Sequence, residues 1–238
     1  MAIDVPTRPS LTRRGLLGGA AALIARPALA RTPPPVSTAL VLAADVSSSI
    51  DDANFALQRR GYAQALTDPR VIRAIQETRH GAIGVCYFEW ASQERQHLLV
   101  PWTRIGDADD GARVAEVLEA APRPFDGSTG LGPALRLATQ LLAQAPFAAT
   151  ERVIDVSGDG PNNDGEEPDR VRDQAVALGI RVNGLAIRGG YQTFPGVITL
   201  PEYYEDNVKG GASAFVLEAE SFETFGATLV AKLRREIT

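Results

Sequence analysis

The chain has 238 residues, of which 45% are hydrophobic and 22% are charged. These values are typical of a soluble globular protein that buries a core in one domain, or at most two. The formal net charge is −5, and it is −8 without residues 1–30, which hold four arginines and one aspartate. Because an acidic chain is poorly suited to bind nucleic acid, we exclude a nucleic-acid partner.

Residues 1–30 have the pattern of an export signal. A basic region precedes a short apolar stretch at residues 15–25 and the cleavage pattern Ala28-Leu29-Ala30. The stretch is too short to span a bilayer, so we expect no transmembrane segment in the mature chain. The run Thr12-Arg13-Arg14-Gly15-Leu16-Leu17 resembles the twin-arginine export signal of bacteria, with an ordinary secretory signal as the alternative. Either signal predicts a periplasmic or secreted protein.

Residues 31–36 are predicted to form a stiff, proline-rich linker, and residues 37–238 a single domain. In that domain, apolar runs of strand length alternate with segments of helical periodicity. Strands are expected near residues 38–44, 82–88, 97–101, 152–157, 180–187 and 213–218. Helices are expected near residues 51–66, 69–78, 107–120, 131–144, 167–178 and 221–236.

This alternation predicts a three-layer, doubly wound α/β fold, in which helices cover both faces of a mostly parallel six-stranded sheet. One edge strand is expected to be antiparallel, because the link at residues 89–96 is too short for a parallel crossover. The segment Arg188–Gly211 lacks clear periodicity and is predicted to be a loop. Cys86 is the only cysteine and is expected to be a buried hydrophobic residue rather than a nucleophile.

Oxygen-bearing side chains follow two of the predicted strands. Asp45, Ser47 and Ser49 come after the first strand, Asp159 ends the fourth, and Thr129 opens a helix between them. Ligands of open α/β sheets bind beyond the carboxyl ends of the strands, so these loops meet if the first and fourth strands are adjacent. Carboxylate and hydroxyl oxygens suit a hard divalent cation. The sequence therefore predicts one metal site with all five residues as ligands.

The order Asp45-x-Ser47-x-Ser49, then Thr129, then Asp159-Gly160 resembles the metal-ion-dependent adhesion site (MIDAS) of von Willebrand factor A (VWA) domains, with a likeness over residues 36–236. The resemblance implies that the two serines bind the ion through their hydroxyl groups. It also implies that Thr129 and the two aspartates bind it directly or through water. Mg²⁺ is the expected ion, with Mn²⁺ or Ca²⁺ as alternatives, because few charged ligands and retained water suit a small octahedral cation. In the family, an Asp or Glu of a protein partner fills the open coordination position.

Three further runs resemble an exported bacterial subfamily of VWA-like proteins of unknown function, which adds no activity. They are Tyr87–Trp90, Val153–Asn163 and Asn183–Ile187. A partner-binding rim is predicted from the residues after the second and fourth strands, with a plain link to the edge strand and an ordinary turn as the alternatives. The rim residues are Glu89, Trp90, Asn162, Asn163 and Asp164.

Two other functions are considered. Ser49 and Thr129 also suit helix caps, which would leave a structural VWA-like domain without metal. A Mg²⁺-dependent phosphohydrolase places an aspartate after its first strand, but Ser47 stands where the haloacid-dehalogenase pattern has its second aspartate. Residues 127–132 lack the lysine of a P-loop, and the sequence lacks the Gly-x-Ser-x-Gly nucleophile elbow. We therefore predict an exported, metal-dependent protein-binding domain and not an enzyme.

Overall fold

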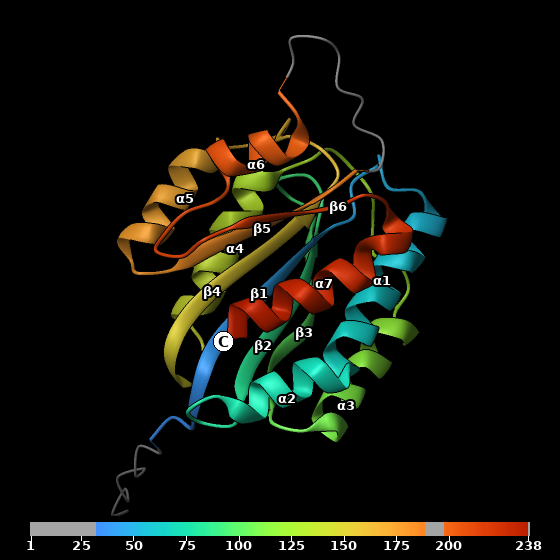
Figure 1. The fold of residues 1–238 in the computed structure, drawn as a ribbon. Helices are drawn as coiled ribbons and strands as arrows, with labels where there is room; N and C mark the ends of the chain where they lie inside the picture. The colour runs from blue at the N-terminus through green and yellow to red at the C-terminus, as the bar shows by residue number, and fades with distance from the viewer. Residues whose placement is uncertain (1–31, 189–197, 238) are drawn as a thin grey trace, which may run out of the picture. The chain divides into compact units, whose positions relative to one another are not determined.

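The computed structural model describes residues 32–188 and 198–237. The predicted export signal and part of the segment Arg188–Gly211 lie outside the described residues. Figure 1 shows a central sheet with helices on both faces. Its six strands have the order β3-β2-β1-β4-β5-β6. They are β1 (Pro35–Asp45), β2 (Ile83–Trp90), β3 (Gln96–Ile105), β4 (Ala148–Gly158), β5 (Arg181–Ile187) and β6 (Val216–Ala219).

The pairing of the strands confirms the predicted fold class. β1 lies between β2 and β4 and is parallel to both. β5 and β6 continue the parallel sheet, whereas β3 pairs with β2 in antiparallel orientation at the edge. Because the chain leaves β1 toward β2 on one side and reaches β4 on the other, the carboxyl ends of β1 and β4 flank a topological switch point.

Helices cover the sheet on both faces (Figure 1). One face is covered by α1 (Asp52–Thr67), α2 (Pro69–Glu77), α3 (Ala108–Ala120) and α7 (Phe222–Ile237). The other is covered by α4 (Leu131–Ala143), α5 (Pro168–Ala177) and α6 (Leu200–Asn207). Every residue of β1 from position 36 onward is buried, and the middle of this central strand, residues 39–44, is a continuous apolar run. Cys86 in β2 is buried, as predicted.

Two predictions about element boundaries are wrong. The segment predicted to be a loop contains α6, which starts with a capping box between Thr199 and Glu202. This helix has only eight residues and buries only Leu200 and Tyr204, too few for its periodicity to be detected. In addition, β1 begins inside the predicted linker, because Pro35 already pairs with Ala148 of β4.

The core between the sheet and α7 contains a cluster of charged groups. Lys232 Nζ lies 2.6 Å from Asp155 Oδ1 and 2.5 Å from Glu236 Oε1, and all three side chains are fully buried. Asn183 Nδ2 also donates to Glu236 Oε1 at 2.9 Å. One cation therefore faces two carboxyl groups. Burial, and then the charge of Asp155, raise the pKa of Glu236 to about 8, so Glu236 holds a proton at neutral pH.

This shift makes folding stability depend on pH. The pKa of Glu236 is about 8 in the folded state, against 4.5 for an ordinary glutamate, so between these values the folded state holds a proton that the unfolded state has released. The contribution to stability is complete below about pH 4.5 and is lost as the pH rises to about 8. We expect Glu236→Gln to remove this part of the pH dependence, measured as the free energy of unfolding in urea.

Glu205→Gln is the matched control, because Glu205 pairs with Lys209 at the surface. Its stability should follow the same pH dependence as that of the wild-type protein. A Glu236→Gln variant with an unchanged pH profile would contradict the prediction.

Candidate metal site

The loop after β1 brings three of the predicted ligands to the end of β4. Ser49 Oγ donates a hydrogen bond to Asp159 Oδ1 at 2.6 Å. The hydroxyl oxygens of Ser47 and Ser49 lie 3.1 Å apart. Asp45 Oδ1 accepts from the backbone N–H of Ser47 at 2.8 Å, which turns the loop back over the end of the strand. These four residues thus form one hydrogen-bonded chain.

Thr129 reaches the same place from a third loop. Its Oγ1 lies 3.9 Å from the point where a Cβ at Gly160 would stand. Its backbone N–H donates to Asn163 Oδ1 at 2.7 Å, and the N–H of Asn163 donates to Thr129 O at 2.9 Å. A similar reciprocal pair joins Ser48 to Gly127, at 2.8 and 3.1 Å. Hydrogen bonds therefore connect all three loops. We call the five predicted ligands, Asp45, Ser47, Ser49, Thr129 and Asp159, the oxygen cup.

The oxygen cup opens to solvent at one side. Asp45, Ser47 and Asp159 are 0%, 1% and 2% exposed, and Thr129 is also buried. Ser49 is exposed. A group from solvent would therefore enter the cup past Ser49.

The two carboxyl groups of the cup are buried and incompletely bonded. Asp45 Oδ2 and Asp159 Oδ2 have no hydrogen-bond partner among the described residues. Burial, and then the charge of Asp159, raise the pKa of Asp45 to about 7. Burial also raises the pKa of Asp159. A divalent cation would supply the missing positive charge and use both free oxygen atoms, so the donor set fits such an ion.

The alternative role of the hydroxyl groups as helix caps is wrong. α1 is capped by Asp51 rather than by Ser49. α4 is not capped by Thr129, because the N–H groups of residues 131 and 132 donate to Asn162 Oδ1 at 2.8 and 3.2 Å. The hydroxyl groups of Ser49 and Thr129 therefore do not cap a helix.

The prediction that Glu89 and Trp90 belong to a partner-binding rim is wrong. Glu89 and Trp90 are both 0% exposed and belong to β2 itself, so neither can contact a partner at the surface. Glu89 tolerates burial because Arg59 Nε lies 2.7 Å from its Oε1, and the hydroxyl of Tyr87 donates to the same oxygen at 3.2 Å.

The other three rim residues follow Asp159 along the chain, and their side chains bind backbone N–H groups. Asn162 and Asn163 accept from the N–H groups described above, and Asp164 Oδ2 accepts from the N–H of Gln93 at 2.7 Å. Asp164 also lines a polar cavity with residues 92–95. Contact of these three residues with a partner stays a prediction.

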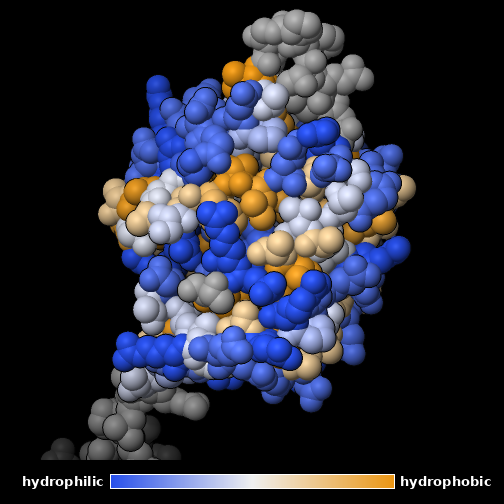
Figure 2. All heavy atoms as spheres, in the orientation of Figure 1, coloured by the Kyte–Doolittle hydropathy of each residue, from blue (hydrophilic) through white to orange (hydrophobic). Residues whose placement is uncertain are grey.

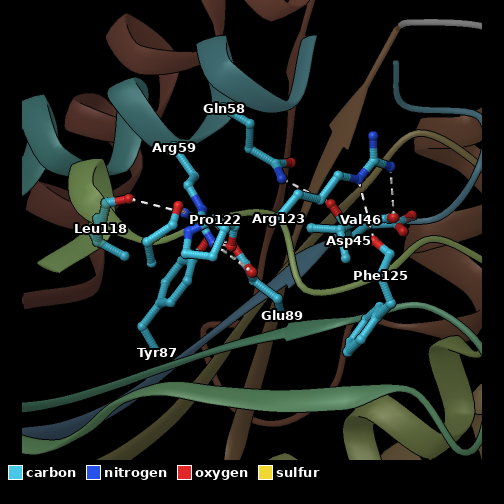
Figure 3. A network of polar contacts seen from close by, with 11 residues as sticks. Asp45, Val46, Gln58, Arg59, Tyr87, Glu89, Leu118, Pro122, Arg123 and Phe125 are labelled. Atoms are coloured by element: carbon cyan, nitrogen blue, oxygen red, sulfur yellow. Dashed lines mark hydrogen bonds and ion pairs between the residues drawn. The ribbon is translucent and has the colours of Figure 1, made fainter. Parts of the chain in front are cut away.

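Polar groups that the sequence did not point to support the cup (Figure 3). Gln58 Nε2 donates to Asp45 O at 2.8 Å. Arg123 Nη2 donates to three carbonyl oxygens of the loop after β1, those of Val46, Ser47 and Ile50, at 3.0, 3.3 and 2.8 Å. Arg123 therefore fixes the path of the loop that carries the serines.

Arg59 holds the segment from which Arg123 extends. It donates to the carbonyl oxygens at the end of α3 and just beyond, those of Leu118, Ala121 and Pro122 (Figure 3). In the sequence, these supporting residues are indicated only by the adjacent polar residues Gln58 and Arg59 in the middle of α1. Both are buried, at 0% and 4% exposure.

Solved structures with a similar fold contain VWA domains. Proximal thread matrix protein 1 from the mussel byssus has 15% identity and a TM-score of 0.63, and the match covers 86% of this chain and 49% of that chain. The pilus adhesin SpaC from Lactobacillus rhamnosus GG has 15% identity and a TM-score of 0.60, with coverage of 86% and 30%. A von Willebrand factor type A protein from Catenulispora acidiphila has 14% identity and a TM-score of 0.56, with coverage of 85% and 42%. This chain thus spans about half the length of these proteins or less.

The fold is therefore that of a VWA-like domain, and identities this low show the fold alone. A family model described as a protein of unknown function (DUF1194) matches residues 35–238, and the chain belongs to that family. No curated protein matches the chain.

Removal of one charge from the oxygen cup should stabilise the metal-free protein. Asp45→Asn keeps an oxygen for the N–H of Ser47 but removes a buried charge that faces Asp159. In a chelating buffer at about pH 8, we expect its free energy of unfolding to exceed that of the wild type by roughly 1 kcal/mol, a common size for a stabilising substitution. The measurement is denaturation in urea. Asp51→Asn, which keeps a good cap for α1, is the control and should change little. A lower free energy of unfolding for Asp45→Asn than for the wild type would contradict the prediction.

Arg123→Met should loosen the loop of the cup. Because three carbonyl oxygens lose a donor, we expect the free energy of unfolding to fall by about 1–3 kcal/mol. Arg95→Met is the control, since Arg95 is half exposed and pairs with the exposed Asp126. It should change stability by less than about 0.5 kcal/mol. Equal effects of the two substitutions in urea denaturation would show that Arg123 does not support the loop.

Proposed function

We propose that this chain is an exported protein-binding domain whose contact with its partner depends on a divalent metal ion in the oxygen cup. One observation carries the proposal: Asp45 Oδ2 and Asp159 Oδ2 are buried, without a hydrogen-bond partner in the described part of the chain, beside serine hydroxyls at an opening to solvent. A cation offsets the burial of two carboxylates, and the hydroxyls add neutral ligands. An Asp or Glu side chain of a partner protein then completes the shell of the ion.

In this proposal, Ser47 and Ser49 hold the ion through Oγ, and Thr129, Asp45 and Asp159 hold it directly or through water. Among the described residues, no group of three or more His, Cys, Asp or Glu side chains could hold a metal. The ion thus depends on hydroxyls and water beside two carboxylates, which suits Mg²⁺, with Mn²⁺ or Ca²⁺ as alternatives. One structure of proximal thread matrix protein 1 has a zinc-occupied MIDAS motif, which supports a divalent ion in a site of this type.

A phosphohydrolase is the competing function, and the burial of Asp45 argues against it. An aspartate nucleophile must reach the phosphorus atom of its substrate. Asp45 is 0% exposed, and its Oδ1 is held by the N–H of Ser47. In addition, Ser47 cannot act as the acid and base that such an enzyme needs at that position. Both features favour a binding domain.

We further propose that the mature protein is periplasmic or secreted, that residues 1–30 direct its export by the twin-arginine route, and that residues 37–238 form the VWA-like domain. Within residues 32–188 and 198–237, no helix has both the length and the apolar character needed to cross a membrane.

Metal binding tests the proposal first. Titration calorimetry should show saturable binding of Mg²⁺ to the chelator-treated wild-type protein, and binding should raise its melting temperature. Thr129→Ala and Asp159→Ala should bind at least about tenfold more weakly, a loss of about 1.4 kcal/mol. Ser128→Ala is the matched control, since Ser128 is an exposed neighbour outside the cup. Absence of binding for Mg²⁺, Mn²⁺ and Ca²⁺ would refute the proposal.

Capture of a protein partner tests whether partner binding depends on the metal ion. Proteins from a periplasmic extract that bind the wild-type chain in Mg²⁺ should be lost with a chelator and with Asp159→Ala. Each captured protein should lose binding when its contacting Asp or Glu is changed to Asn or Gln. Turnover of a panel of phosphate esters, abolished by Asp45→Asn, would instead support the enzyme.

A further inference from the structure

Tyr204 lies on the buried side of the oxygen cup. It belongs to α6, it is 0% exposed, and its hydroxyl has no hydrogen-bond partner among the described residues. The hydroxyl oxygen and Asp45 Oδ2 lie 2.6 and 2.8 Å from the same point, where a Cβ at Gly158 would stand. Both of these buried oxygen atoms therefore approach Gly158 of β4 closely.

Two glycines make room for the ring of Tyr204. A Cβ at Gly184 of β5 would stand 2.7 Å from Tyr204 Cδ1, and a Cβ at Gly158 would collide with the hydroxyl. Both strands therefore lack a side chain where α6 approaches the sheet. A methyl group at either position would push the ring away from the sheet. The close approach of the ring is thus built into two neighbouring strands.

A second contact joins α6 to the cup. The hydroxyl of Tyr203 accepts from the N–H of Asn162 at 3.2 Å. Asn162 in turn binds the start of α4, which follows Thr129. Consecutive tyrosines of α6 therefore reach two different parts of the same site.

We propose that Tyr204 is a positioning residue of the ion site, whose hydroxyl donates to Asp45 Oδ2 through one water and so orients this carboxylate. This inference rests on the proposed function. A hydroxyl suits the role because it is a neutral donor: it satisfies a carboxylate oxygen without supplying a cation that would compete with the metal. A tyrosine hydroxyl is protonated at neutral pH and can therefore act as the donor.

Tyr204→Phe tests the role, because it removes the hydroxyl and keeps the ring. By calorimetry, we expect it to bind Mg²⁺ about tenfold more weakly than the wild type, as for the loss of one hydrogen bond to a charged group. Tyr62→Phe is the matched control. Tyr62 is equally buried, and its hydroxyl contacts Ser157 Oγ at 2.9 Å on the other face of the sheet. This variant should keep wild-type affinity, and both variants should keep the wild-type circular dichroism.

A spectroscopic readout separates positioning from a purely structural role. Addition of Mg²⁺ should produce a near-ultraviolet difference spectrum of tyrosine in the wild type and in Tyr62→Phe, and this signal should be absent in Tyr204→Phe. The difference spectra of the wild type and of Tyr62→Phe therefore test the inference without any substitution at Tyr204.

The outcomes separate this inference from the proposed function. If the wild type binds Mg²⁺ and Tyr204→Phe binds it equally well, the role of Tyr204 is refuted and the metal-dependent function stands. A wild-type protein that binds Mg²⁺ without any tyrosine difference spectrum also refutes it. If the wild type binds no divalent ion, both proposals fail together.

Discussion

The structure depends on the placement of two carboxyl groups at the ends of adjacent parallel strands. β1 and β4 are paired along nearly their whole length, up to Ala44 opposite Ser157, so Asp159 leaves β4 one residue beyond the level of Asp45. Burial and mutual repulsion disfavour two charges there. The loops must therefore be held in place by other interactions. Reciprocal hydrogen bonds between loops, and donors from α1 and from Arg123, supply them.

The oxygen cup differs in charge from the rest of the core. The described residues include five buried acidic side chains, and three of them face a cation: Glu89 faces Arg59, and Asp155 and Glu236 face Lys232. The remaining two, Asp45 and Asp159, have no ion pair among the described residues, and the charge of Asp159 raises the pKa of Asp45. Elsewhere, then, the fold neutralises buried carboxyl groups, but at the end of β1 it does not. A site that is poor for stability in this way is typical of a binding function. In the orientation of Figure 1, the surface is mostly hydrophilic, with groups of apolar side chains between the polar ones (Figure 2).

The sequence predicts the features that have local signals. Most strands contain an apolar run. Asp45, Ser47, Ser49 and Asp159 lie at or just after the ends of β1 and β4, which are adjacent in the sheet, and Thr129 precedes α4. The sequence does not show where β2 ends: the strand continues through Glu89 and Trp90, and these predicted rim residues become buried. Neither does it show contacts between distant segments. Arg123, Gln58 and Tyr204 meet the cup only after folding, and nothing in their neighbouring residues indicates those partners.

The supports of the cup leave its charge intact. Gln58 and the backbone N–H groups are neutral donors. Arg123 is cationic, but its Nη2 donates to carbonyl oxygens and its Nη1 to the exposed Asp52, not to the cup. The cup therefore keeps up to two negative charges, and these would repel an approaching carboxylate. A bound divalent cation balances them, so a partner's Asp or Glu meets a neutral site with a free coordination position. A monovalent ion would leave one negative charge uncompensated. On the proposed function, this charge balance makes capture of an acidic partner depend on a divalent ion.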